Sequence, residues 1–89
     1  MPVAQLTIVN RLGLHARAAA KFVQTAAHYG CEVQVCKDGK KVNGKSIMGV
    51  MMLAAAQGAE IEISTSGADE QAALDALAAL IADKFGEPS

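Results

Sequence analysis

Apolar and polar residues alternate along four short segments of the chain, as in strands that bury one face. These segments predict strands at Ala4–Val9, Glu32–Val35, Lys41-Val42 and Glu60–Ile63. Asp38-Gly39 separates the second from the third, and this dipeptide is typical of a two-residue hairpin turn. We therefore expect the second and third strands to pair as a β-hairpin.

Three other segments show the spacing of helices. The first should run from about Ala16 to His28, with Gly30 in the left-handed position that often closes a helix. Its alanine-rich inner face is expected to consist of Ala16, Ala19, Ala20, Val23, Ala26 and Ala27.

The other two helices begin at residues that favour a helix N-cap. Ser46 should cap a short apolar helix from about Ile47 to Ala55, and Asp69 should cap the last one. In the last helix we expect the inward side chains to be Leu74, Leu77, Ala78, Ile81 and Phe85.

The predicted order βαββαβα restricts the topology. A right-handed crossover makes the first two strands parallel, and the fourth can lie between them, antiparallel to both. We therefore predict an α+β fold, a two-layer open-faced β-sandwich whose four-stranded antiparallel sheet is covered on one face by three helices. Residues 1–89 should form a single domain.

Composition limits the setting in which the chain acts. No secretory signal pattern follows Met1, and the longest strongly apolar run, Ile47–Ala56, is too short to span a bilayer, so we expect a cytoplasmic protein without membrane insertion. On one extended strand, Cys31 and Cys36 would lie roughly 16 Å apart, too far for a disulfide. Neither has the spacing to a histidine that is typical of a zinc site, so no metal is expected.

Charge is segregated along the chain although the net charge is −1. Residues 1–45 contain seven basic and two acidic side chains, whereas residues 46–89 contain seven acidic side chains and one lysine. The basic half favours an acidic or phosphorylated partner, although simple segregation between sheet and last helix is the alternative. Nucleic acid is disfavoured, because Phe22, Tyr29 and Phe85 form no stacking cluster in the sequence.

The segment Gly13-Leu14-His15-Ala16-Arg17 begins the first helix without a residue that could cap it. Arg17 places a cation at the positive end of the helix dipole, which is unfavourable unless an anion binds there. Free N–H groups, the dipole and a guanidinium together suit a phosphate. We therefore predict that His15 is a nucleophile that accepts a phosphoryl group, and that Arg17 neutralises its charge.

Two motifs, Gly13-Leu14-His15-Ala16-Arg17 and Gly44-Lys45-Ser46-Ile47-Met48, together with the order of elements, resemble the HPr family over essentially the whole chain. Its members are histidine-containing phosphocarriers of the bacterial phosphoenolpyruvate-dependent phosphotransferase system. The resemblance implies a stoichiometric carrier rather than an enzyme. Enzyme I would phosphorylate His15 on Nδ1, and an enzyme IIA component would receive the group. No cofactor is implied, and a monomer is expected.

The same resemblance gives roles to the second motif. Ser46 matches the serine that HPr kinase/phosphorylase modifies in many members. Ile47, Met48 and Met51 align with the apolar docking surface. From the residues alone, the apolar helix is open to two interpretations, a partly exposed docking helix or a wholly buried one.

Ala18 stands where the family commonly has proline, and this difference leaves open whether the chain serves sugar uptake or a nitrogen-related regulatory branch. Two other functions remain as alternatives. One is a purely regulatory protein switched at Ser46 without histidine phosphotransfer. The other is a small phosphatase on the same frame, for which no residue that positions water is evident.

Overall fold

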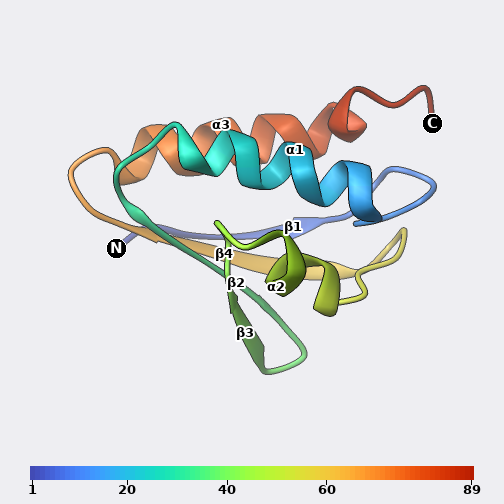
Figure 1. Cartoon of the computed structure of the whole chain (residues 1–89), viewed down its shortest axis with the longest axis horizontal. Coiled ribbons are helices and arrows are strands. Elements are labelled where there is room, and N and C mark those ends of the chain that lie inside the picture. Colours follow the sequence, from blue (N-terminus) through green and yellow to red (C-terminus); the bar gives the residue numbers. More distant parts are fainter.

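All residues from 1 to 89 are described by the computed structural model, in which four strands form one antiparallel sheet (Figure 1). The strands are β1 (Val3–Thr7), β2 (Glu32–Lys37), β3 (Lys40–Asn43) and β4 (Glu60–Ser66), in the spatial order β1-β4-β2-β3. Because β4 is antiparallel to both β1 and β2, those two strands run parallel. The predicted split arrangement is confirmed.

Three α-helices cover one face of this sheet, which confirms the predicted α+β class. They are α1 (Ala16–Ala27), α2 (Ile47–Met52) and α3 (Glu70–Ala82), followed by the short 3₁₀ segment η1 (Lys84–Gly86). α1 and α3 lie side by side over the sheet, and α2 packs against α1 and β3 (Figure 1). The opposite face is open, as expected of strands that bury only one face. Its exposed polar side chains are Gln5, Thr7, Glu32, Gln34, Glu60 and Glu62.

The hydrophobic core lies between the sheet and the helices. Apolar side chains of β2 and β4 meet those of α1 and α3, and the largest fully buried ones are Phe22, Phe85, Ile8, Ile61, Ile63, Leu77, Val35 and Val50. Burying this apolar area is the main favourable contribution to folding, at about 25 cal/mol per Å² removed from water.

The inner face of α1 differs from the predicted one. Ala18 and Phe22 are fully buried there, whereas Ala16 and Ala27 are exposed. A helix rich in alanine has small apolar side chains on several faces, so the pattern of alanines alone does not fix which face turns inward. Phe22 determines which face of α1 packs on the sheet, because burying its side chain removes far more apolar area from water than burying any alanine does.

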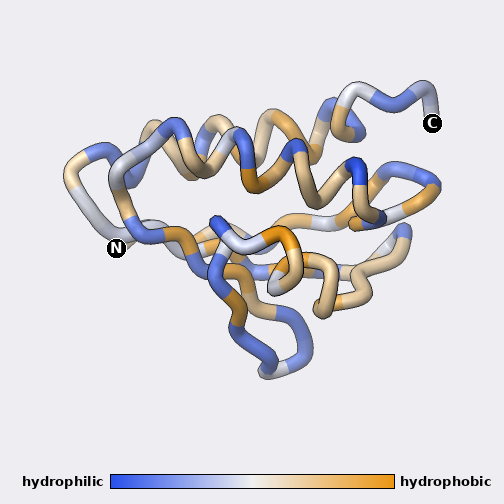
Figure 2. The backbone as a smooth tube through the Cα atoms, in the orientation of Figure 1, coloured by the Kyte–Doolittle hydropathy of each residue, from blue (hydrophilic) through white to orange (hydrophobic).

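The turn between β2 and β3 has the predicted form. Lys37 pairs with Lys40, and Asp38 and Gly39 both have positive φ, of 51° and 81°. Two consecutive positive φ values are typical of the tight turn that Asp-Gly favours. Figure 2 shows that the tip of this hairpin is hydrophilic, whereas the helices above the sheet have hydrophilic and hydrophobic stretches in alternation.

Asp69 is the N-cap residue of α3, as predicted, but its side chain connects the start of α3 to the start of β2 instead of capping its own helix. Its side chain forms no capping hydrogen bond; Oδ2 accepts from the Gly30 N–H at 2.9 Å and Oδ1 from the Cys31 N–H at 3.0 Å. The bond from Gly30 is the main reason why the pKa of Asp69 is lowered. The predicted side-chain cap is therefore wrong, because the carboxylate already accepts two bonds from another segment.

Gly30 also differs from expectation. Its φ is not positive, and α1 ends instead with the N–H groups of His28 and Tyr29 donating to Thr25 O and Ala26 O, at 3.1 and 3.2 Å. Beyond them, the N–H of Gly30 is directed to Asp69, so no left-handed residue is needed there.

Both cysteines are free thiols. Cys31 is buried directly before β2, and its burial raises the pKa of its thiol. Cys36 lies within β2 and is partly buried. As for the bilayer, none of the helices has the length and apolar character needed to cross it.

We predict that Asp69→Asn lowers the free energy of unfolding at neutral pH, because the variant loses the charge that strengthens two hydrogen bonds. The pKa of Asp69 is lowered in the folded protein, so its contribution is present above the usual aspartate range, about 4, and is lost as pH falls below it. The difference between variant and wild type should therefore shrink in acid, as measured by urea unfolding at several pH values. Asp83→Asn, which removes an exposed charge whose side chain forms no capping hydrogen bond, is the control for the loss of a charge alone.

Candidate functional site

The loop before α1 is held against the segment that follows α2. Gly13 has a φ of +68°, and a Cβ at this position would lie 2.4 Å from the carbonyl oxygen of Ala55. Directly after it, the N–H of Leu14 donates to the same oxygen at 2.8 Å. Glycine is therefore required both by the backbone conformation and by the close approach. The loop thereby places His15, the residue after Leu14, at the start of α1.

His15 is the N-cap residue of α1 and has an extended backbone, with no side-chain capping bond. Its carbonyl accepts from the Ala19 N–H at 2.8 Å, whereas the N–H groups of Ala16, Arg17 and Ala18 have no acceptor within the protein. The predicted absence of a cap is confirmed. Three free donors and the positive end of the helix dipole thus lie next to the His15 ring, an arrangement that suits an anion.

Arg17 is exposed on the first turn of α1 and forms no ion pair. Together with Arg11 and Leu12 it lines an open cavity of about 170 Å³, whose other lining residues are 87–89. The structure therefore brings the two residues of the predicted site, His15 and Arg17, to the same end of α1, and it adds Arg11, to which the sequence had given no role. Two guanidinium groups at this position favour a negatively charged ligand.

Glu87 is a member of this site that the sequence did not indicate. Its Oε2 is hydrogen-bonded to Nε2 of His15, and its Oε1 accepts from the Asn10 amide at 3.0 Å. Only 7% of the Glu87 side chain is exposed, compared with 25% for His15. The bond from Asn10, followed by the one from His15, lowers the pKa of Glu87, so its carboxylate is ionised at neutral pH.

An unusual turn after α3 brings Glu87 to the His15 ring. Lys84, Phe85 and Gly86 all have positive φ, between 56° and 77°. Phe85 is fully buried, and its carbonyl accepts from the Lys21 ammonium group at 2.7 Å, so packing and a charged bond hold the left-handed turn in place. Phe85 is thus inward as predicted, but it lies in η1, because α3 ends at Ala82.

Ser46 is the N-cap residue of α2, as predicted. Its Oγ accepts from the Gly49 N–H at 3.1 Å, and its carbonyl accepts from Val50 N–H at 3.0 Å. The helix is shorter than expected, ending at Met52 instead of Ala55. A turn follows in which Ala54 has a positive φ of 51°, and this turn carries the Ala55 carbonyl toward Gly13.

The outer face of α2 is apolar and exposed. We call Ile47, Met48 and Met51 the α2 surface; their exposed fractions are 43%, 74% and 41%. Val50 is the only fully buried residue of this helix, so the alternative of a wholly buried helix is wrong. Flexible methionines on an exposed face are suited to contact with more than one partner.

Comparison with known proteins identifies the family of the chain. Residues 3–83 match the family model described as the PTS HPr component phosphorylation site. The chain belongs to the HPr family. It is 56% identical to the phosphocarrier protein HPr of Cupriavidus necator over 81 residues, which cover 91% of each protein.

Solved structures of the HPr family have the same fold. The crystal structure of HPr-C-His from Thermoanaerobacter tengcongensis is 49% identical and matches with a TM-score of 0.96 over 100% of both chains. An HPr dimer from the same bacterium is 50% identical, with a TM-score of 0.79 over 98% of this chain and 100% of that one. HPr proteins are phosphocarriers of the phosphotransferase system, interact with its enzyme I and enzyme IIA components, and are not enzymes in the strict sense.

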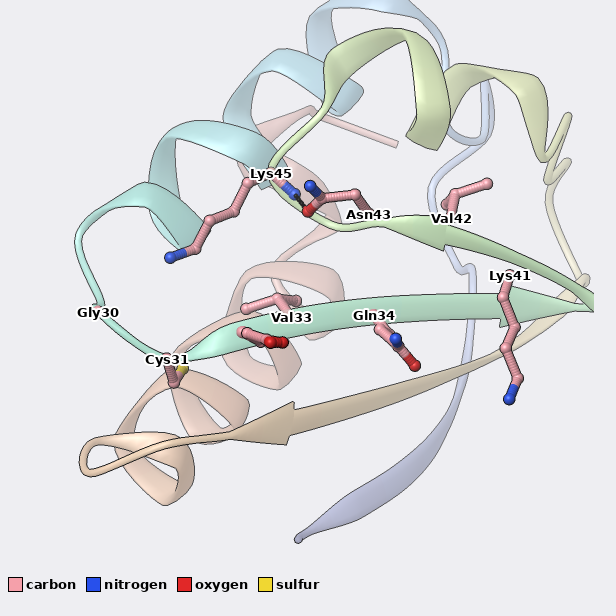
Figure 3. A pocket seen from close by; sticks show the side chains of 9 residues that line it. Gly30, Cys31, Val33, Gln34, Lys41, Val42, Asn43 and Lys45 are labelled. Carbon is pink, nitrogen blue, oxygen red and sulfur yellow. Dashed lines mark hydrogen bonds between the residues drawn. The ribbon is translucent and has the colours of Figure 1, made fainter.

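The largest cavity of this HPr-family chain is elsewhere. It measures about 550 Å³, lies where β2 and β3 diverge, and contains neither His15 nor Arg17 (Figure 3). Two lysines border it, but the ammonium group of Lys45 already donates to the Tyr29 carbonyl at 2.6 Å, and Glu32 lies on the same lining. This cavity is therefore separate from the start of α1, where both residues of the predicted site lie.

We predict that Gly13→Ala destabilises the protein by more than Gly39→Ala. Both substitutions require an alanine at positive φ, which costs about 1–2 kcal/mol. Only the methyl group at residue 13 would also collide with the Ala55 carbonyl, because nothing lies within 4 Å of a Cβ at residue 39. The collision should add at least about 1 kcal/mol to the loss, measured by urea unfolding. Equal losses in the two variants would contradict the close approach.

Proposed function

We propose that His15 accepts a phosphoryl group from phosphorylated enzyme I and passes it to an enzyme IIA component. The observation that supports this proposal is the uncapped start of α1, where His15 lies beside the free N–H groups of Ala16 and Arg17. Those donors would bind oxygens of the phosphoryl group, and the unpaired guanidinium of Arg17 would neutralise its charge. The group thus supplies the negative charge that the helix start lacks.

In the transfer, a lone pair of the His15 ring forms a bond to phosphorus while the bond between phosphorus and the donor breaks. The second transfer repeats the step with an acceptor histidine of the enzyme IIA component as nucleophile, which restores His15. The chemistry needs positioning and charge stabilisation, because no other bond is made or broken. His15 is modified and regenerated in each cycle, so the protein acts as a stoichiometric carrier.

The α2 surface is the proposed docking site for both partners. It is held next to His15 because the Leu14 N–H is bonded to the Ala55 carbonyl, shortly after α2. Arg11 and Arg17 are exposed at the same end of the molecule. An exposed apolar centre flanked by cations fits partner surfaces that are apolar and acidic.

We further propose that residues 1–89 are one domain that works as a monomer in the cytoplasm. The single sheet takes strands from both halves of the sequence, and the core includes residues from Ile8 to Phe85, which supports one cooperative unit. The family also includes the dimeric HPr described above. Sedimentation of the full chain at several concentrations distinguishes the two states.

We expect His15→Ala to abolish phosphorylation by enzyme I and phosphoenolpyruvate, because no other ring lies at the uncapped helix start. The wild-type label should be lost in acid, as expected of a phosphohistidine. His28→Ala is the matched control and should be labelled like the wild type, since His28 lies at the other end of α1. Equal labelling of the His15 variant would refute the proposal. An acid-stable label at Ser46 with none at His15 would support the purely regulatory alternative.

Ser46 is proposed as a regulatory site for HPr kinase/phosphorylase. A phosphate on its hydroxyl would lie at the start of α2, where a helix tolerates negative charge. The same charge would adjoin the α2 surface and repel an acidic partner. Phosphorylation there would thus reduce docking without unfolding the protein.

We predict that Ser46→Asp slows phosphoryl uptake from enzyme I by on the order of tenfold, because like charges are brought together at the docking surface. Its free energy of unfolding should stay close to that of the wild type, because Asp is also a good N-cap. Ser46→Asn is the control: it caps equally well, adds no charge and should leave the rate unchanged. Ser46→Ala should cost about 1 kcal/mol of stability through the lost cap.

A further inference from the structure

The His15 ring is held by a short relay of side chains that comes from three separate parts of the chain. Asn10 is fully buried, and its amide donates both to the Gly13 carbonyl, at 2.8 Å, and to Oε1 of Glu87, at 3.0 Å. The other carboxylate oxygen, Oε2, is bonded to Nε2 of His15. Asn10 therefore fixes Glu87, and Glu87 in turn contacts one nitrogen of the ring.

This contact determines which ring nitrogen carries the proton. A carboxylate accepts hydrogen bonds and cannot donate them, and the lowered pKa of Glu87 keeps it ionised at neutral pH. In the neutral ring, Nε2 must then be the protonated nitrogen. Nδ1 forms no hydrogen bond within the protein, and its lone pair is left free.

We propose that Glu87 is a positioning residue that keeps the proton of the neutral His15 ring on Nε2, so that Nδ1 is the nitrogen free to accept the phosphoryl group. The proposal rests on the carrier function proposed above and assigns it a further residue. Glu87 does not touch the transferred group in this role; it acts through the ring. A second consequence is orientation, because a ring bonded at Nε2 is no longer free to turn.

The turn after α3 gives the relay its rigidity. Glu87 follows directly after the three residues with positive φ, and the burial of Phe85 and its bond from Lys21 fix the position of that turn. Two residues beyond Glu87, the carbonyl of Ser89 accepts from the Arg11 N–H at 3.1 Å. The carboxylate is thus anchored on both sides along the chain as well as by Asn10.

Glu87→Gln tests this proposal, because it replaces one carboxylate oxygen by a donor. The Asn10 amide still requires an acceptor, so the remaining oxygen of Gln should face Asn10 and the NH₂ group should face His15. That group would donate to Nε2, and the proton of the ring would move to Nδ1. Two-bond ¹H–¹⁵N correlation spectra of the full chain, labelled at histidine and recorded where the ring is neutral, distinguish the two tautomers.

We expect the Nε2–H tautomer of His15 in the wild type and the Nδ1–H tautomer in Glu87→Gln. His28 is an internal control, because its Nδ1 faces the Gln24 carbonyl at 2.9 Å and it should keep the Nδ1–H form in both proteins. Glu62→Gln, an exposed change on the open face of the sheet, should leave His15 unaltered. Glu87→Ala, which leaves no side-chain group at residue 87 to bond the ring, should leave neither tautomer of His15 fixed.

The rate of phosphoryl uptake completes the test. Glu87→Gln should accept the group from phosphorylated enzyme I at least about tenfold more slowly than Glu62→Gln, as expected when the nucleophilic nitrogen carries the proton. An Nδ1–H tautomer in the wild type, or an unchanged tautomer or rate in Glu87→Gln, would overturn the proposal. If wild-type His15 is not phosphorylated at all, the carrier function fails, whereas the spectra still report whether Glu87 sets the tautomer.

Discussion

The contact between Gly13 and Ala55 is the constraint on which the arrangement of the site depends. It joins the loop before α1 to the turn after α2 at a distance that excludes any side chain on residue 13. A backbone hydrogen bond from the Leu14 N–H to the Ala55 carbonyl stabilises this contact between the two segments. As a result, the proposed nucleophile and the proposed docking surface, which are some thirty residues apart in the sequence, are held close to one another. Neither helix could place both features alone.

The positive charge at the start of α1 is partly balanced by a negative side chain from outside the helix. Three N–H groups lack acceptors there, and Arg17 adds a further positive charge. An ion pair between Arg17 and an acidic side chain would relieve this excess, but it would also occupy the guanidinium. Instead, the negative charge of Glu87 lies at the His15 ring, and the donors stay free. The protein thus has a negative group at the ring, while the N–H groups and the Arg17 guanidinium stay available.

The sequence predicts most of the fold because the signals for strands, for the Asp38-Gly39 turn and for the Ser46 cap are local. It also predicts the absent cap at His15, which follows from residue types next to one another. It fails where distant segments compete for the same group. Asp69 has a residue type that favours an N-cap, yet it accepts from Gly30 and Cys31. Glu87 lies 72 residues from His15 in the sequence, after a left-handed turn that no sequence pattern predicts.

The hydrogen bonds of the folded helix start do not depend on the N–H of Ala18. Its side chain is fully buried in the first turn, and its N–H has no acceptor in the protein. The proline common in the family lacks that N–H, so the exchange removes no hydrogen bond from the folded state. Its effect falls on the unfolded chain, which is freer with alanine by about 0.4–1 kcal/mol of conformational entropy. Alanine at residue 18 therefore increases the entropy that must be lost before the site can form, while leaving the backbone donors of the site in place.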